Sequence, residues 1–216
     1  MDTEFWKKRW QDEQIGWHAH ETNKHLQRFV SSLNASVGDW TLVPLCGKSL
    51  DMDFLASQGR KVVGIELSPI ACRAFFAETQ RPYEERVTES LVLFESDDVI
   101  LVCGDIFSVR SCDLPLIEAC YDRACLVAFT LEQRRRYANW LTSIMASQAR
   151  TLLVGVEYPA AEKNGPPFTV PREEVYRLFG DGFVLEELHR EDSIDKAPKY
   201  REWGVTSLVE TVYSMT

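Results

Sequence analysis

The sequence predicts an α/β fold: a doubly wound, mostly parallel sheet with helices on both faces, closed by an antiparallel strand at its C-terminal end. From residue 40 onward, short apolar runs alternate with helical patterns, which is typical of parallel strands joined by crossover helices. The first run ends in a tight glycine turn, and the second ends in a carboxylate, Glu66, 19 positions after Gly47. The last two apolar runs, 183–189 and 206–213, have no helical pattern between them, which predicts an antiparallel pair.

The N-terminal residues are amphipathic. Three tryptophans stand among charged residues, namely Trp6, Trp10 and Trp17. Their offsets of 4 and 11 place them near one helical face, although Gly16 argues against one unbroken helix over 4–20. A second helix is expected over 22–34, with Thr22 or Asn23 as its N-cap.

The central residues follow the alternating pattern. A buried strand at 40–45 precedes a helix over 49–58 that ends before a glycine, and a second strand at 61–66 follows. Ser68 and Pro69 are a capping residue and a first-turn proline, so they predict a helix through about residue 80. The later elements are expected as a hairpin of 90–94 and 98–103, a strand at 117–121, a helix at 131–147 and a strand at 152–156.

Composition limits the classes of function. A chain of 216 residues fits a single domain, and a formal net charge of −9 argues against nucleic acid as the main partner. Its six cysteines form no C-x-x-C pair and several stand in apolar runs, as free thiols of a reducing compartment do. The sequence has neither an apolar leader nor a run of transmembrane length. We therefore expect a cytoplasmic protein that binds no membrane.

The glycine turn and Glu66 indicate the ligand. In doubly wound folds the first turn meets a nucleotide-like ligand, and an acidic side chain about 20 residues on binds ribose hydroxyls. The three-glycine phosphate fingerprint is missing, which suggests a ribose without a pyrophosphate and so points to S-adenosylmethionine. A phosphate loop would need glycine at position 42, where Leu42 stands. A nicotinamide-dependent oxidoreductase and a non-catalytic ligand-binding domain of the same fold are the alternatives.

Further candidates follow the later strands at the same sheet edge. Asp105 and Ile106 are placed to contact an adenine, although Asp105 also suits a simple Asx-turn. Asp122 and Arg123 are candidates for orienting and holding an electron-rich acceptor, with a local ion pair as the alternative. The loop with Pro167 and Phe168 offers a substrate wall or mere rigidity.

The remaining motifs point away from metal and hydrolase chemistry. His18, His20 and His25 lack the carboxylate or cysteine of a recognised ligand spacing, so no metal is expected. The nucleophile elbow G-x-S-x-G is absent from the sequence.

An ordered set of segments resembles the thiopurine S-methyltransferase family along nearly the whole chain. The segments are Trp6…Trp10-Gln11-Asp12, Pro44-Leu45-Cys46-Gly47-Lys48, Val62-Val63-Gly64-Ile65-Glu66, residues 122–128 (DRACLVA), Gly165-Pro166-Pro167-Phe168 and Trp203-Gly204. The resemblance implies a class I methyltransferase fold with S-adenosylmethionine as methyl donor. It also implies one domain over 1–216, in which a covering segment, 1–21, precedes a Rossmann-like core, 22–216. The acidic, compact chain looks like a bacterial member.

The resemblance also implies roles for single residues. Leu45 and Gly47 would contact the methionine part of the donor, Glu66 the ribose, and Asp105 and Ile106 the adenine. The three tryptophans and Arg123 would complete the donor site. The acceptor would be bound by Trp17, Arg123, Pro167, Phe168 and Lys199. Lys199 stands where the family has a second arginine, and Arg201 is near it. Lysine keeps the charge but lacks the planar fork of arginine.

The expected reaction is methyl transfer to a small aromatic or heterocyclic thiol, and by the same resemblance to selenium or tellurium compounds. Arg123 and Asp122 are the expected catalytic residues, and the protein is expected to act as a monomer.

Overall fold

The computed structural model describes residues 3–123 and 125–216. Positions 1, 2 and 124, which belong to the expected covering segment and to one family motif, lie outside the described residues. The strands are β1 (Trp40–Pro44), β2 (Lys61–Glu66), β3 (Glu84–Val87), β4 (Val92–Glu95), β5 (Val99–Cys103), β6 (Ile117–Arg123), β7 (Met145–Glu157), β8 (Leu185–Asp192) and β9 (Val209–Met215). The α-helices are α1 (Thr3–Gln11), α2 (Lys24–Phe29), α3 (Leu50–Ser57), α4 (Pro69–Thr79), α5 (Cys125–Ala128), α6 (Leu131–Ile144), α7 (Arg172–Phe179) and α8 (Pro198–Glu202). Short 3₁₀ turns are η1 (Val30–Leu33), η2 (Ile106–Ser108), η3 (Ser111–Asp113) and η4 (Ile194–Lys196).

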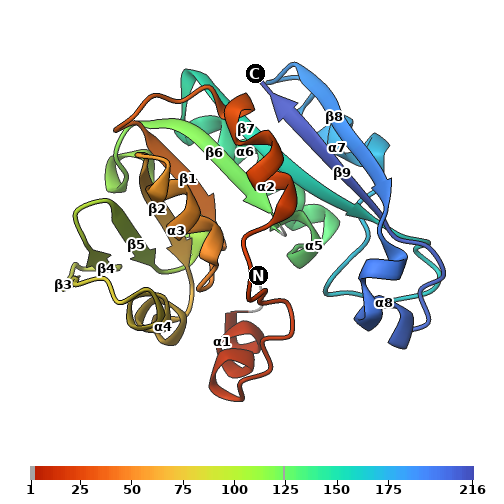
Figure 1. Cartoon of the computed structure of the whole chain (residues 1–216), viewed down its shortest axis with the longest axis horizontal. Coiled ribbons are helices and arrows are strands. Elements are labelled where there is room, and N and C mark those ends of the chain that lie inside the picture. The colour runs from red at the N-terminus through yellow and green to blue at the C-terminus, as the bar shows by residue number, and fades with distance from the viewer. Residues whose placement is uncertain (1–2, 124) are drawn as a thin grey trace.

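The strands form a nine-stranded sheet in the order β3-β4-β5-β2-β1-β6-β7-β9-β8 (Figure 1). The central strands β5, β2, β1, β6 and β7 are parallel, and β9 pairs antiparallel with both β7 and β8. At the other edge β3, β4 and β5 form an antiparallel meander. The predicted mostly parallel sheet with an antiparallel C-terminal strand is confirmed.

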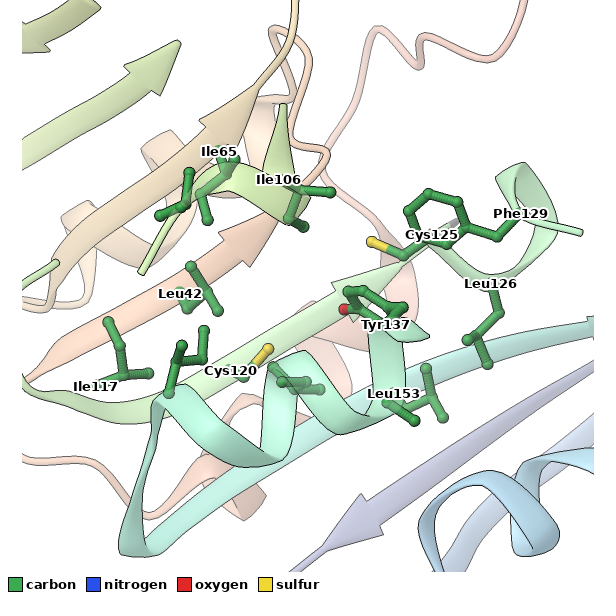
Figure 2. Packing of buried hydrophobic residues seen from close by; sticks show 14 of the residues in the cluster. Leu42, Ile65, Ile106, Ile117, Cys120, Cys125, Leu126, Phe129, Tyr137 and Leu153 are labelled. Carbon is green, nitrogen blue, oxygen red and sulfur yellow. The ribbon is translucent and has the colours of Figure 1, made fainter. Parts of the chain in front are cut away.

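Helices cover both faces of the sheet. On one face, apolar side chains of α2, α3 and α4 pack on β1, β2 and β5. On the other face, α5, α6 and α7 pack on the opposite side of the same strands, as Figure 2 shows for Tyr137 of α6, near Cys125 and Cys120. Buried parallel strands therefore read as continuous apolar runs in the sequence.

The helix starts follow local capping chemistry. The side chain of Asn23 accepts hydrogen bonds from the backbone N–H groups of His25 and Leu26, and Ser49 accepts from Asp51. Thr130 and Gln133 form a reciprocal capping box at α6. Ser68 stands at the N-cap of α4 as predicted, but its side chain makes no cap hydrogen bond.

Several boundaries differ from the prediction. The helix expected to reach residue 147 ends at Ile144, and β7 begins at Met145 rather than 152. The segment between β8 and β9 contains η4 and α8, so the expectation of no helix there is wrong. β3 and α7 were not predicted.

The N-terminal segment lies beyond the carboxyl ends of the central strands, between α4 and α8 in the view of Figure 1. Helix α1 ends at Gln11 and the chain then turns back, so the three tryptophans do not share one helix. Instead, Trp17 packs edge-to-face on Trp6 and Trp10, with ring centroids 5.3 and 6.1 Å away. None of the helices in the described part of the chain has the length and apolar composition needed to span a membrane.

Candidate active site

The turn after β1 is held by the carboxylate that ends β2. Gly47 N–H donates to Glu66 Oε2 at 2.9 Å, and Ser68 N–H donates to Glu66 Oε1 at 2.7 Å. Gly47 has a φ of +55°, which favours glycine, and an added Cβ would lie 3.3 Å from the Trp10 ring. The spacing of 19 residues thus brings these two groups into direct contact.

Glu66 is buried, and burial raises its pKa to about 7, while the backbone N–H groups of Ser68, Gly47 and Leu67 lower it. A carboxylate has about four lone-pair positions, and the backbone N–H groups named above occupy up to three of them. Glu66 therefore retains the capacity to accept a further hydrogen bond.

A cavity lies beside this turn, closed by the N-terminal segment. Its walls come from that segment, from the turn, and from the ends of β1 and β6. They are Trp10, Trp17, His18, Ala19, Val43–Ser49, Asp51, Tyr121 and Arg123. The structure thus brings together five predicted site residues, Trp10, Trp17, Leu45, Gly47 and Arg123, with Trp6 packed behind Trp17.

Arg123 reaches this cavity from the end of β6 with its guanidinium facing Asp51. Its Nη1 lies 3.9 Å from Asp51 Oδ2, and that carboxylate also accepts hydrogen bonds from Tyr121 Oη at 3.1 Å and from the Asn23 N–H at 2.7 Å. At 3.9 Å this pair is longer than a hydrogen bond, so among the described residues the Arg123 guanidinium keeps donors available.

Asp122 lies on the other side of the strand from its neighbour Arg123. Its carboxylate is wholly buried and accepts a hydrogen bond from Tyr137 Oη at 2.7 Å. Burial raises the pKa of Asp122, while Tyr137 and Cys125 lower it by hydrogen bonding. The alternative of a local ion pair between Asp122 and Arg123 is wrong, because successive residues of a strand face opposite sides. The carboxylate that faces Arg123 is Asp51.

The predicted adenine contacts follow β5, which is the neighbour of β2. Asp105 caps η2 by accepting a hydrogen bond from Phe107 N–H at 3.0 Å, so the Asx-turn interpretation holds. Ile106 is fully buried in the core and Asp105 is partly exposed. Gly104 N–H donates to the Glu66 carbonyl at 2.9 Å, which sets this turn beside Glu66 but outside the cavity lining.

The predicted acceptor wall is a loop pinned on both sides. Phe168 N–H donates to the Val127 carbonyl at 2.7 Å, and Tyr158 Oη donates to the Pro167 carbonyl at 2.5 Å. Both Gly165-Pro166 and Pro166-Pro167 peptide bonds are cis. Pro167 and Phe168 are partly exposed and stand beyond the cavity lining.

Lys199 belongs to α8 and binds the covering segment. Its Nζ donates to the Gly16 carbonyl at 2.7 Å. A second, more open hollow is lined by Glu13, Ile15, Gly16, His18, His20, Lys48 and Lys199. Because His18 and Lys48 line both spaces, the outer hollow adjoins the inner cavity.

Sequence reasoning missed Asp51, Tyr121 and His18. Asp51 stands four residues after Gly47, and Tyr121 directly precedes Asp122. Their closeness in sequence to predicted site residues could have identified them. His18 was weighed only as a metal ligand, although it follows Trp17 directly.

His25 lies apart from His18 and His20, between α2 and β8–β9. Its Nε2 is 3.4 Å from both Glu191 Oε1 and Glu210 Oε2. His189 and Glu191 complete a group whose ligand atoms lie within 4.8 Å of one another. Lys24 and Lys196 bind Glu191 at 2.5 and 2.9 Å and lower its pKa to about 2. These lysines already compensate the carboxylate charge, so the group is an ionic link between α2 and the last strands.

The chain is similar to known proteins in both sequence and fold. The family model described as thiopurine S-methyltransferase matches residues 1–216. Thiopurine S-methyltransferase of Xanthomonas axonopodis pv. citri (strain 306) is 40% identical over 215 residues, covering 100% of this chain and 99% of that protein. That of Pseudomonas aeruginosa (strain LESB58) is 41% identical over 213 residues, covering 99% and 98%.

Solved structures show the same fold at low identity. A SAM-dependent methyltransferase from Anabaena variabilis ATCC 29413 has a TM-score of 0.67 at 12% identity, covering 99% of this chain and 94% of that one. Geranyl diphosphate C-methyltransferase from Streptomyces coelicolor A3(2), in complex with Mg²⁺, geranyl diphosphate and S-adenosyl-L-homocysteine, has a TM-score of 0.59 at 13% identity, covering 88% and 76%.

Proposed function

The chain belongs to the thiopurine S-methyltransferase family, and from this premise we propose how its residues bind the two substrates of the reaction. The protein is an S-adenosylmethionine-dependent methyltransferase that acts on a small thiol. The observation that carries the assignment of residues is the contact between the Gly47 turn and the Glu66 carboxylate, beside an aromatic-walled cavity. The proposal includes small aromatic or heterocyclic thiols, and selenium or tellurium compounds, as acceptors.

The residues present fit S-adenosylmethionine. The Gly47 turn lets the Trp10 ring pack close to the backbone, because an added Cβ would lie 3.3 Å from that ring, and we propose that the ligand's amino-acid part binds beside this turn. Glu66 has acceptor capacity left for the ribose hydroxyls. Trp10 and Trp17 offer aromatic faces to a cationic ligand, which contribute about 0.5 to 2 kcal/mol. We propose that the turn after β5, with Asp105 and Ile106, binds the adenine.

When bound, S-adenosylmethionine supplies a methyl group on a positively charged sulfur, which is already a strong electrophile. The protein therefore has mainly to orient the acceptor sulfur and exclude water. Orientation of this kind contributes on the order of 7 kcal/mol or more. Arg123 stabilises the anionic acceptor with donors that Asp51 leaves free, and Lys199, Pro167 and Phe168 form the outer acceptor side.

Replacing Arg123 by alanine is expected to lower kcat/KM for anionic thiol acceptors by about 10- to 100-fold. This is the factor that corresponds to a lost charge-assisted hydrogen bond of about 1.5 to 3 kcal/mol. Initial rates with an aromatic thiol measure the effect, and Arg123→Lys is the control that keeps the charge. An unchanged kcat/KM with every acceptor would show that Arg123 has no part in acceptor binding.

We also propose the kind of partner that the protein binds and the compartment in which it acts. A formal net charge of −9 supports a small-molecule acceptor rather than a nucleic acid, because a phosphate backbone needs a basic face. All six cysteines are free and five are buried, which supports a reducing compartment such as the cytoplasm. A monomer that binds no membrane is part of the same proposal.

Titration calorimetry followed by an activity assay tests the function. S-adenosylhomocysteine is expected to bind with micromolar affinity and NAD(H) is not, and an aromatic thiol is expected to become methylated. Binding without turnover on thiol and selenium acceptors would favour the non-catalytic alternative. Binding of NAD(H) alone would favour the oxidoreductase.

A further inference from the structure

His18 lies where the inner cavity and the outer hollow adjoin. Its side chain lines both spaces, together with Lys48. The backbone fixes its place, since His18 N–H donates to the Ile15 carbonyl at 2.8 Å, directly after Trp17. An acceptor that enters through the outer hollow toward Arg123 passes this imidazole.

The groups around His18 favour its neutral form. Its pKa is lowered from 6.5, by burial first, then by Lys48 of the turn, His20 of its own segment and Arg123 of β6, while Glu78 of α4 raises it. The hollows add Glu13, Lys199 of α8, and Asp51 of α3 to its surroundings. Lys48 is already paired with Glu78 at 2.5 Å, and the His18 and His20 rings are 5.2 Å apart. Among the described residues that line both spaces, His18 is the titratable group able to accept a proton at neutral pH.

We propose that His18 is the general base that takes the proton from thiol acceptors that are not ionised in solution. This inference rests on the proposed methyltransferase function. It extends the acceptor class from thiols already ionised at neutral pH to less acidic thiols, such as alkyl or benzyl thiols.

The proton transfer balances within the established reaction. The acceptor S–H bond breaks and its proton moves to an imidazole nitrogen of His18. The sulfur electron pair then forms the bond to the methyl carbon while the bond from that carbon to the donor sulfur breaks. The imidazolium returns its proton to water through the open outer hollow. Arg123 favours the anionic sulfur in between.

Replacing His18 by glutamine separates the two kinds of acceptor. We compare para-nitrothiophenol, which is ionised at neutral pH, with benzyl mercaptan, which is not. Loss of a general base is expected to lower kcat for benzyl mercaptan about 100-fold or more and to leave para-nitrothiophenol turnover close to wild type. His189→Gln, on β8 and in the lining of neither space, is the matched control, and it is expected to keep the wild-type ratio of the two rates.

A second readout does not depend on turnover. Thiophenol is titrated into the complex with S-adenosylhomocysteine, and its thiolate absorbance is followed against pH. The wild type is expected to hold more thiolate at neutral pH than His18→Gln does.

The outcomes distinguish the two proposals. If the wild type methylates neither thiol, the proposed function fails. If it methylates both and His18→Gln lowers the two rates equally, or loses S-adenosylhomocysteine binding as well, His18 is a structural residue and the base assignment is wrong.

Discussion

Replacing Glu66 by glutamine is expected to weaken S-adenosylhomocysteine binding by two to three orders of magnitude. The amide places an N–H₂ group against the N–H of Gly47 or Ser68, both of which now donate to the carboxylate. It also has fewer acceptor positions for the ribose hydroxyls. Loss of about 3 to 4 kcal/mol from such charge-assisted bonds corresponds to a factor of roughly 100 to 1000. Titration calorimetry measures it. Glu186→Gln, on exposed β8, is the control and should bind like the wild type.

The same carboxylate should make binding depend on pH. The pKa of Glu66 is raised to about 7. In the donor site that we propose, ribose hydroxyls donate to its ionised form. The ligand therefore favours deprotonation, so affinity should fall as pH decreases through about 7, and binding should release protons. Calorimetry in buffers of different ionisation enthalpy measures the number of protons released on binding. Any protonation of the ligand itself affects wild type and Glu66→Gln equally. Identical pH profiles of binding for the two proteins would therefore contradict this role of Glu66.

Replacing Arg134 by alanine is expected to lower the free energy of unfolding by about 3 to 5 kcal/mol. Arg134 of α6 is buried and donates to both oxygens of Glu174 at 2.9 Å. It also donates to the carbonyl of Leu126 at 2.8 Å and to that of Thr169 at 3.0 Å. The variant leaves a buried carboxylate and two carbonyls without this partner, beside the loop that we assign to the acceptor. Urea denaturation measures the loss.

The double variant Arg134→Met with Glu174→Met is the control for this prediction. It removes both charges at similar volume, and such replacements are often neutral or stabilising. We expect it to recover the part of the stability that Arg134→Ala loses to the unpaired Glu174 carboxylate. A single variant within about 1 kcal/mol of wild type would mean that the pair contributes no more than an ordinary surface contact.

The strands that are buried on both faces of the sheet were predictable, because such burial requires a continuous apolar run in the sequence. This holds for β1 and β2, whose bounds agree with the prediction within one residue. β3 was missed because all four of its residues are exposed and three are charged, so only its pairing with β4 makes it a strand. The start of β7 was read as helix because Met145 and Ala146 are good helix formers and are only partly buried. α8 is too short to show a period.

A site residue was predictable where it stands at or just after the end of a predicted strand. Gly47 and Glu66 meet because parallel neighbours β1 and β2 end at the same edge. Asp122 and Arg123 were assigned to one site as neighbours in sequence, but the alternation of a strand separates them. Asp51 and His18 come to the cavity from a helix start and a turned-back segment, so only their closeness in sequence to Gly47 and Trp17 could have pointed to them.

The three packed tryptophans give the covering segment an intrinsic optical signal. They are half of the six indoles of the protein, and Trp10 is buried whereas Trp17 is 40% exposed. Edge-to-face rings in a fixed array give near-ultraviolet circular dichroism, and emission from Trp10 reports whether water reaches it. Departure of the segment from the Gly47 turn would change both signals. The rate at which the enzyme admits and releases its ligands is therefore accessible to stopped-flow fluorescence without a label.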